Sequence, residues 1–371
     1  MKTVAKNIYK VVLTGGPAAG KTTLISRILK EFDQDDGWRV ITIPETATEL
    51  ISGFGLKPFG GCMSMLAFQD FVIADQIHKE ALALKACDVV EEENILILYD
   101  RALMDDKAYI SDDEFKEVIA RFDGRTEESV LNNYDMVLHL VTCAKGAEFA
   151  YDLGNTARTE SVEYAREMDD RTLRAWKGHH NLRIIDNSVD FDDKLQRAVW
   201  AIQQAVGREA PAEKKQKFLV CMPDVKKLQR EHNAAELRMV QTYLMETESG
   251  VERRARRMQN GKDTWYFYSE KHHTEDSAGW VTERRISETE YERYLKQADP
   301  KLQPVEKVKY RFVYSDHRFE LDIYPFSKDR AILFRYATDG RGEIPSELNV
   351  LKEVTGEPEY KNKSLAGRRQ L

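Results

Sequence analysis

The stretch "VVLTGGPAAGKTTLI", residues 11–25, decides the fold of the first half of the chain. An apolar run typical of a strand leads into a glycine-rich turn, and apolar residues at helical spacing follow. The turn has the pattern GxxxxGK[ST] of a phosphate-binding loop, whose N–H groups point at an anion at a helix N-terminus. We therefore predict a cofactor-binding loop made of Gly15, Gly16, Pro17, Ala18, Ala19, Gly20, Lys21, Thr22 and Thr23.

The ligand that this loop predicts is ATP or GTP, bound together with Mg²⁺. In loops of this pattern the lysine reaches the β- and γ-phosphates, and the hydroxyl residue after it binds the metal. We therefore expect Lys21 on the phosphates and Thr22 on Mg²⁺. A chance match is the alternative, and the strand and helix around the loop argue against it.

Apolar runs and helical patterns alternate along the chain after this loop. Strands are predicted at residues 38–45, 94–100, 134–141 and 182–186, with helical patterns between them, for example at 64–88 and 159–177. Strands that alternate with helices form a parallel sheet with helices on both faces. The first half is therefore predicted to be an α/β P-loop NTPase domain.

Charged side chains stand where these strands end, which is the edge at which parallel sheets bind ligands. We expect Glu45 to face the acceptor or the attacking water; a solvated strand end is the alternative. We expect Asp100, which closes "NILILYD", to hold Mg²⁺ or to position water; a helix N-cap is the alternative. The candidate catalytic residues are Lys21, Glu45, Asp100, Arg101, Asp105 and Arg158.

Arg158 and Arg166 belong to a helical pattern that follows "DLGNTAR". We expect these arginines, Arg158 first, to close over the phosphates as a lid and to stabilise charge in the transition state. A solvated helix face is the alternative reading of the same residues.

The second half of the chain has a different pattern, with eight successive strand-like runs and few helices between residues 214 and 371. This pattern predicts an antiparallel barrel or closed sheet. In "VEKVKYRFVY", residues 305–314, cations occupy every second position, so one face of that strand carries three of them. Other strands repeat the alternation, with Arg254 and Arg256 on one face and Glu320 and Asp322 on one face.

A flat surface sheet would place such charges in water. Because several strands repeat the pattern, we favour a closed barrel with a positive lumen, and such a lumen is stabilised by a polyanion such as a triphosphate. The predicted anion-binding residues are Lys217, Arg254, Arg256, Lys271, Lys307, Lys309 and Arg311.

Four stretches of the first half, "VVLTGGPAAGKTT", "IPETATELI", "YDRALMDDKAY" and "GNTARTESVEYA", resemble a branch of P-loop proteins that includes the ribosylnicotinamide-kinase domain of NadR. Within that branch, residues 8–206 most resemble the nucleotide-binding half of the TRPL-translocation-defect proteins. The resemblance implies binding of ATP or GTP, and roles for Lys21, Thr22, Glu45, Asp100, Arg101 and Asp105. It does not name the acceptor.

Stretches of the second half, among them "VERRARRMQNGKDTWYFYSEK", "KVKYRFVY" and "FELDIYPF", are similar to the CYTH domain, the triphosphate tunnel metalloenzyme fold. The resemblance covers residues 212–368 and implies an eight-stranded antiparallel β tunnel in which the cations grip phosphates. It implies Mg²⁺, or Mn²⁺ in the tunnel, as the metal. The carboxylates that remain for a metal there are Glu213, Glu283, Glu320 and Asp322.

This sequence departs from the CYTH pattern at the metal-binding acids. The opening ExExK reads "EKKQK", with Lys215 in place of the second glutamate. Val281 replaces one acid of a middle pair, and Arg335 and Ala337 stand where a late pair is expected. Because hard cations need carboxylate oxygens, we expect the second half to bind an anion more readily than to hydrolyse one.

Composition limits the classes of partner. No run of about 18 apolar residues occurs, so we expect no transmembrane segment; the four cysteines form no CxxC pair, so we expect a reducing cytoplasm. The net charge of −7 argues against nucleic acid. Adjacent histidines at 179–180 and 272–273 point apart, which argues against shared zinc.

We thus predict a P-loop nucleotide-binding, kinase-like domain at 1–206, a linker at 207–213 and a CYTH-like β-tunnel domain at 214–371. The protein would be a phosphotransferase or NTPase with a tunnel for a (poly)phosphate, and its partners a nucleotide and a small phosphorylated or hydroxyl-bearing ligand. One alternative is a nucleotide-switched adaptor whose tunnel binds phosphatidic acid or another phospholipid head group. A second alternative is an inorganic triphosphatase in the tunnel.

Overall fold

The computed structural model describes residues 6–32, 37–58, 63–153, 161–208, 210–211, 215–272, 280–336, 343–368 and 371. The chain divides into two compact units, Met1–Val199 (unit 1) and Trp200–Leu371 (unit 2). The boundary falls within helix α9 (Phe191–Ala205). No helix in the described ranges is long and apolar enough to cross a membrane.

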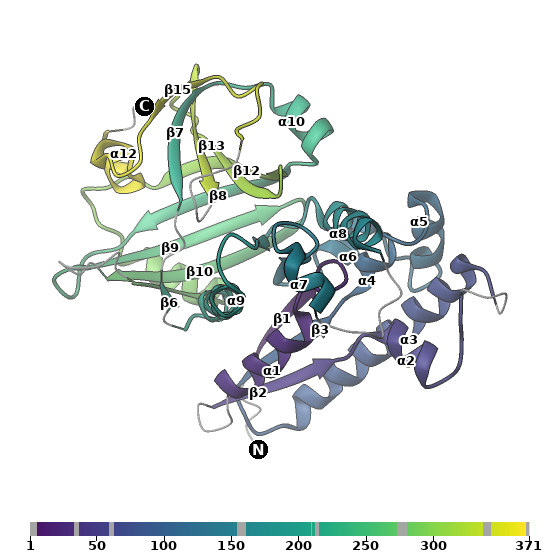
Figure 1. Ribbon diagram of the computed structural model, residues 1–371. Coiled ribbons are helices and arrows are strands. Elements are labelled where there is room, and N and C mark those ends of the chain that lie inside the picture. The colour runs from purple at the N-terminus through teal and green to yellow at the C-terminus, as the bar shows by residue number, and fades with distance from the viewer. Residues whose placement is uncertain are drawn as a thin grey trace. The chain divides into compact units, whose positions relative to one another are not determined.

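Unit 1 is a parallel five-stranded sheet flanked by helices, as the sequence predicts (Figure 1). The strand order is β2-β3-β1-β4-β5. The strands are β1 Asn7–Thr14, β2 Trp38–Ile43, β3 Asn94–Asp100, β4 Met136–Leu140 and β5 Leu182–Ile185. The helices are α1 Lys21–Glu31, α2 Thr46–Ser52, α3 Met65–Val89, α4 Leu103–Asp106, α5 Asp112–Ala120, α6 Glu127–Leu131, α7 Glu148–Leu153, α8 Val162–Trp176 and α9.

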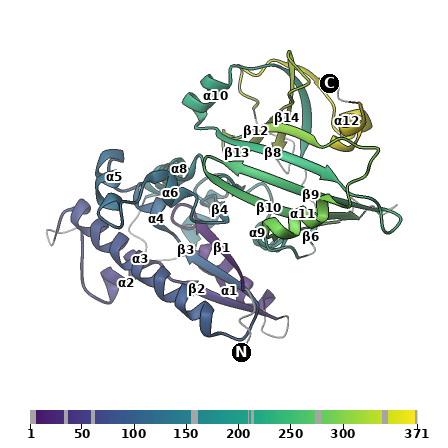
Figure 2. The ribbon, with the colours of Figure 1, turned by 180° about the vertical axis from the view of Figure 1, so that it is seen from behind.

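The order of the strands determines which helices share a face of this sheet. Helix α1 leads from β1 past β3 to β2, and α3 leads back from β2 to β3. Because crossovers between parallel strands are right-handed, these two helices cover opposite faces (Figures 1 and 2). Helix α9 joins α1, since Arg27 of α1 forms an ion pair with Asp192 of α9 at 2.6 Å. The central strands are therefore buried on both sides, with Val11, Val12 and Leu13 fully buried.

Unit 2 is built on one ten-stranded antiparallel sheet, in the order β15-β7-β14-β13-β12-β8-β9-β10-β11-β6. Its strands are β6 Ala210–Pro211, β7 Gln216–Cys221, β8 Ala235–Tyr243, β9 Val251–Asn260, β10 Asp263–His272, β11 Trp280–Ile286, β12 Val305–Tyr314, β13 His317–Ile323, β14 Arg330–Tyr336 and β15 Val350–Glu353. Helices α10 Val225–His232, α11 Glu288–Leu295 and α12 Asn362–Arg368, and the short helix η2 Pro358–Tyr360, complete the unit.

The eight strands predicted from the sequence are β7 to β14, and two short strands extend the sheet at its ends. Strand β6 lies inside the predicted linker 207–213 and pairs with β11; β15 pairs with β7. In the described part of the chain the two end strands, β15 and β6, do not pair with each other. Closure of the sheet into a tunnel therefore stays a prediction.

The register of this sheet places the predicted anion-binding residues on one face. Residues directly opposite in an antiparallel pair point to the same side. Lys309 is opposite Asp322 and Arg311 is opposite Glu320. Across the sheet, the same face carries Lys217, Gln241, Arg254, Arg256, Lys271, Glu283 and Phe334. We call this side of the sheet the charged face.

Helices α10 and α11 cover the opposite, apolar face. Leu228 of α10 packs with Tyr310, Phe312 and Leu321 of the sheet. Tyr291 of α11 packs on the strands β9 and β10 (Figure 2). These two helices bury the apolar face. The charged face is the other side of this sheet.

Candidate functional site

The phosphate-binding loop joins β1 to α1 in a conformation that requires glycine. Gly15 has φ +131°, and a Cβ there would lie 2.1 Å from the carbonyl oxygen of Leu140. Gly20, the N-cap of α1, has φ +94°. These positive φ angles are costly for other residues. Lys21 Nζ donates to the carbonyl oxygens of Gly15 and Gly16 at 3.2 and 3.3 Å, so the ammonium lies across the loop.

Two buried charged residues from distant helices brace this loop. The Asp169 carboxylate, on α8, accepts from the N–H groups of Gly16 and Thr142 at 2.9 and 3.0 Å. Lys194, on α9, donates to the carbonyl oxygens of Ala19 and Val141 at 3.2 and 2.6 Å. Asp169 itself is balanced by His139 at 3.3 Å and by Lys145 at 3.0 Å. The loop is therefore held in shape before a ligand arrives.

Replacing Asp169 by alanine is expected to destabilise unit 1 by about 3–5 kcal/mol, because buried N–H groups and Lys145 lose their acceptor. Burial favours the neutral acid, but His139 and Lys145 outweigh it and hold the pKa of Asp169 well below its usual range. The contribution is therefore present at neutral pH and is lost as pH falls through that lowered pKa.

Hydrogen exchange of the amides in β1 and β4 measures this loss within unit 1. Asp170→Ala is the matched control, since Asp170 is the exposed neighbour that also pairs with Lys145 at 2.7 Å. Equal protection in the two variants would show that Asp169 does not brace the loop.

At the carboxyl edge of the sheet, Arg101 is the centre of an ion-pair network. Its Nε donates to Glu45 at 2.6 Å, and Nη1 lies 3.5 Å from Asp105. Its backbone has φ +66°, and its N–H donates to the Leu13 carbonyl at 3.0 Å. An arginine in this strained conformation is typical of a functional site. The network ties the end of β3 to the start of the phosphate loop.

Asp105, predicted as catalytic, has the contacts of a positioning residue. It accepts from the Ala102 N–H at 3.0 Å, from Trp176 Nε1 at 3.2 Å and from the Thr14 hydroxyl, as well as from Arg101. It is 1% exposed. With these donors around it, the carboxylate holds Arg101 in place and has little access to a ligand.

Nearby charges and burial change the pKa values of Lys21 and Glu45 in this network. Burial and the charge of Arg101 lower the pKa of Lys21 to about 8. Burial favours neutral Glu45, yet Arg101 and Lys21 outweigh it and its pKa lies below the usual range. Near pH 7 both groups are charged, and a bound phosphate would raise the pKa of Lys21 further.

Asp100 and Thr22 fit a magnesium site. Asp100 ends β3 and is buried, and its Oδ1 has no hydrogen-bond partner. Burial raises its pKa, while Lys21 opposes that change. Thr22 is exposed at the N-terminus of α1, beside the loop. A buried carboxylate oxygen without a donor, together with a hydroxyl, is the oxygen-rich donor set that Mg²⁺ prefers when phosphates supply the remaining ligands.

Two further groups near Arg101, the Asp106 carboxyl and the Tyr109 phenol, were not predicted from the sequence. Burial, then the charge of Asp105, raise the pKa of Asp106 well above its usual range, which favours the neutral acid. Burial raises the pKa of Tyr109 to about 12, although Arg101 opposes this. Both residues lie in the stretch "YDRALMDDKAY", but within it the resemblance implies roles for Asp100, Arg101 and Asp105 and not for these two. Their position after the strand that ends in Asp100 is a second signal that the sequence offers.

The described residues include part of the predicted lid. Arg158 lies outside the described residues. Arg166 donates from Nε to the Ala144 carbonyl at 2.6 Å and pairs with Glu148 at 2.9 Å. The Arg166 side chain therefore connects α8 to the segment before α7 and to the first residue of α7.

On the charged face of unit 2, the acids are already paired with cations. Asp322 lies 2.5 Å from Lys307 and 2.9 Å from Lys309. Glu320 accepts from Lys309, from Arg311 at 2.8 Å and from the Tyr336 hydroxyl at 2.9 Å. Glu283 pairs with Arg256 at 2.7 Å. Glu213, the fourth predicted metal ligand, lies outside the described residues.

Three ammonium groups converge on one ring of the charged face. Lys215, Lys217 and Lys309 place Nζ at 5.0, 5.3 and 5.2 Å from the centre of Phe334. Burial lowers the pKa of Lys217 to about 8. Burial also lowers the pKa of Lys307 to about 8. Like charges that meet in a desolvated place repel one another, and a multivalent anion relieves that repulsion.

The arrangement defines a class of protein: a P-loop nucleotide-binding domain followed by an antiparallel β domain with a cationic face. Residues 10–194 match the family model described as AAA domain. No curated protein matches the chain.

Solved structures with partial likeness include a thymidylate kinase from Ehrlichia chaffeensis, at 14% identity and TM-score 0.36, covering 53% of this chain and all of that chain. An inorganic triphosphatase has 26% identity and TM-score 0.30, covering 42% of this chain and 95% of that one. A protein from Pyrococcus horikoshii OT3 has 14% identity and TM-score 0.27, and the match covers 33% of this chain and 78% of that chain. At such TM-scores the fold assignment depends on the sheet topology and the phosphate loop.

Proposed function

We propose that unit 1 is a Mg²⁺-dependent phosphotransferase that moves the γ-phosphoryl group of ATP or GTP to a small hydroxyl-bearing acceptor. The observation that carries the proposal is the Glu45–Arg101 ion pair, whose atoms are 2.6 Å apart. The pair lies at the edge of the sheet from which the phosphate loop starts. Its ionised carboxylate can accept a proton from an acceptor hydroxyl, and its fixed cation can stabilise negative charge that develops in the transition state. The resemblance to the ribosylnicotinamide-kinase domain of NadR and to TRPL-translocation-defect proteins supports the same class.

The residues of unit 1 divide the work of phosphoryl transfer. Loop N–H groups and Lys21 bind the β- and γ-phosphates. Glu45 uses one oxygen for Arg101, and its other oxygen, which accepts from Thr48 at 2.8 Å, is on a side chain that is partly exposed. That second oxygen can accept the proton of the attacking hydroxyl. A low pKa suits this task, because the transition state is loose and needs positioning more than a strong base.

Mg²⁺ held by Thr22, Asp100 and phosphate oxygens would supply neutralisation of the phosphate charge. Arg101 contributes a positive charge that does not titrate near neutral pH. Burial lowers its pKa, but Tyr109, Glu45 and Asp105 outweigh burial and raise it.

Transfer of label from γ-³²P-ATP or γ-³²P-GTP to a pooled set of nucleosides and other small alcohols tests this proposal. Label on an acceptor, lost in Glu45→Gln, supports a kinase. Label found as free phosphate alone, or left on the nucleotide, contradicts the kinase and favours the nucleotide-switched adaptor.

For unit 2 we infer a binding site for a phosphate-rich anion that needs no metal. The pairing of Glu283, Glu320 and Asp322 with lysines and arginines supports binding over the hydrolysis of an inorganic triphosphate, because these oxygens are committed to cations. The convergence of lysines on Phe334 favours several phosphate charges at once. A linear polyphosphate and a phosphatidic acid head group both carry this chemistry. A competition experiment between tripolyphosphate and vesicles that contain phosphatidic acid shows which of the two binds unit 2 more tightly.

Binding of tripolyphosphate, in the presence of a chelator, is expected to weaken by at least about tenfold between pH 7 and pH 9. Burial lowers the pKa of Lys217 and of Lys307 to about 8, so each is mostly protonated below that pH and mostly neutral above it. The anion gains negative charge over the same range, so a loss of affinity must come from the protein. Calorimetry at matched ionic strength measures it, and constant affinity would exclude these lysines from the site.

A further inference from the structure

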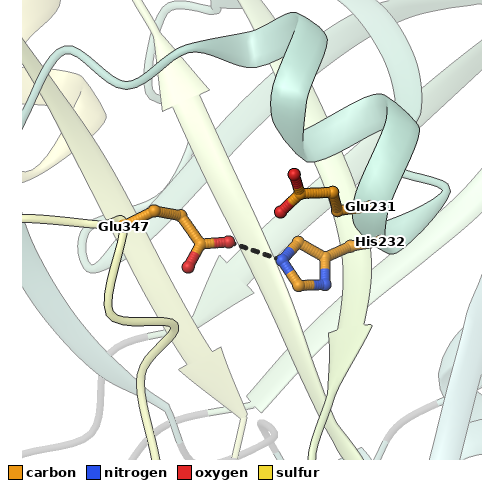
Figure 3. A group of neighbouring side chains, drawn as sticks. All are labelled: Glu231, His232 and Glu347. Atoms are coloured by element: carbon orange, nitrogen blue, oxygen red, sulfur yellow. Dashed lines mark hydrogen bonds and ion pairs between the residues drawn. The ribbon is translucent and has the colours of Figure 1, made fainter.

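Unit 2 holds a second cluster of potential ligands, away from the charged face. Glu231 and His232 are the last residues of α10, and Glu347 lies in the segment before β15 (Figure 3). One ligand atom from each residue lies within 4.8 Å of the other two. In the described ranges this is the one group of three such side chains. His232 Nε2 and a Glu347 oxygen are 2.6 Å apart.

The surroundings fix the imidazole and leave the carboxylates adjustable. The His232 ring contacts the rings of Phe312 and Tyr314, with centroids 5.7 and 5.5 Å away. Glu347 and Glu231 have side chains that are 21% and 42% exposed. Figure 3 shows the Glu347 carboxylate facing the imidazole. The C-terminal end of α10 also presents the negative end of its dipole, which favours a cation.

We propose that Glu231, His232 and Glu347 bind a divalent transition-metal ion of the zinc type, with water completing the coordination. An imidazole nitrogen with carboxylate oxygens selects Zn²⁺, Co²⁺ or Ni²⁺ over Mg²⁺. The alternative is a plain hydrogen bond between His232 and Glu347, in which a proton occupies the nitrogen that the metal would take.

Small side-chain movements make the coordination possible. Two ligands of a tetrahedral ion, each about 2.1 Å from it, are roughly 3.4 Å apart. The pair at 2.6 Å must therefore open slightly, and Glu231 must move inward. Glu231 now lies 3.8 Å from Lys227 and 3.3 Å from Arg230. Ion pairs this exposed are weak, so they oppose the movement little.

The ion would connect the C-terminal end of α10 to the segment that leads into β15. All four residues of β15 are exposed, and among the described strands it pairs with β7 alone. Leu348, next to Glu347, already packs in the cluster that contains Leu228 of α10. A metal here would hold the edge of the sheet through the same two segments.

The test is titration of the metal-stripped full chain with Co²⁺, in excess Mg²⁺ and without nucleotide, followed by displacement with Zn²⁺. We expect one equivalent of Co²⁺ with visible d–d absorption, and an affinity at least about tenfold lower in His232→Ala and Glu347→Gln. The glutamine retains an acceptor for the His232 hydrogen bond, so a purely structural role would survive it.

His317→Ala is the control, since His317 lies in the same unit and is partly exposed, with its ring nitrogen 2.5 Å from the Ser315 carbonyl oxygen. It should bind Co²⁺ like the parent chain. Zn²⁺ should also slow amide exchange in residues 343–353 of the parent chain and of His317→Ala, but not of Glu347→Gln. Absence of the absorption band, or equal affinity in Glu347→Gln, would overturn the proposal.

Discussion

Replacing Lys21 by alanine is expected to lower the rate of γ-phosphoryl turnover by about a thousandfold, since a cation that contacts the transferred group is worth that much in such sites. Lys21 lies across the loop formed by Gly15 and Gly16. Its pKa of about 8 leaves it protonated at pH 7. The measurement is release or transfer of γ-phosphate at saturating nucleotide and Mg²⁺.

The matched control is Lys30→Ala, which removes an exposed lysine from the same helix. It should turn over nucleotide at the parent rate. Tripolyphosphate binding by unit 2 should be unchanged in Lys21→Ala, because none of the residues on the charged face is altered. If Lys21→Ala kept its turnover while substitutions on the charged face abolished it, the division of labour between the units would be wrong.

The phosphate loop could be predicted because its determinants are consecutive in the chain. The residues that brace it could not, since Asp169 lies 153 residues from Gly16 and Lys194 lies 175 residues from Ala19, the loop residues that they hold. Each stands in an amphipathic helix, where a charged residue normally faces water. Their burial follows from the contacts of those helices with the loop, which local periodicity does not encode.

The charged face was predictable in part for a similar reason. Alternation within β12 places Lys307, Lys309 and Arg311 together, whatever the neighbours are. The pairing of these cations with Glu320 and Asp322 depends on the register between β12 and β13, which alternation within a single strand does not give. Phe334 was missed because β14 is apolar on both faces, so alternation gives no signal there.

The two strands absent from the sequence-based prediction are short. β6 has two residues and β15 has four exposed residues, so neither shows an apolar stripe. Pairing with a longer neighbour, and not an intrinsic preference, defines strands of this length.

The double substitution Arg254→Ala with Arg256→Ala is expected to weaken tripolyphosphate binding by about a hundredfold or more, because two charge-assisted hydrogen-bond donors are removed. Both side chains lie on the charged face, opposite Tyr243 and Gln241 of β8. Burial, and then the nearby charge of Arg256, lower the pKa of Arg254, which indicates that these two cations repel each other. An anion between them removes that repulsion.

Arg257→Ala is the control for this pair, since Arg257 is on the same strand but is exposed on the opposite face. Both variants are best compared with the parent charged face in the Lys21→Ala background, so that the phosphate loop does not bind the probe. Glu283 loses its partner in Arg256→Ala, but it is partly exposed and stays hydrated, so folding should survive. An unchanged dissociation constant in the double variant, with Arg257→Ala equally unaffected, would mean that the cations of this face stabilise the sheet and bind no ligand.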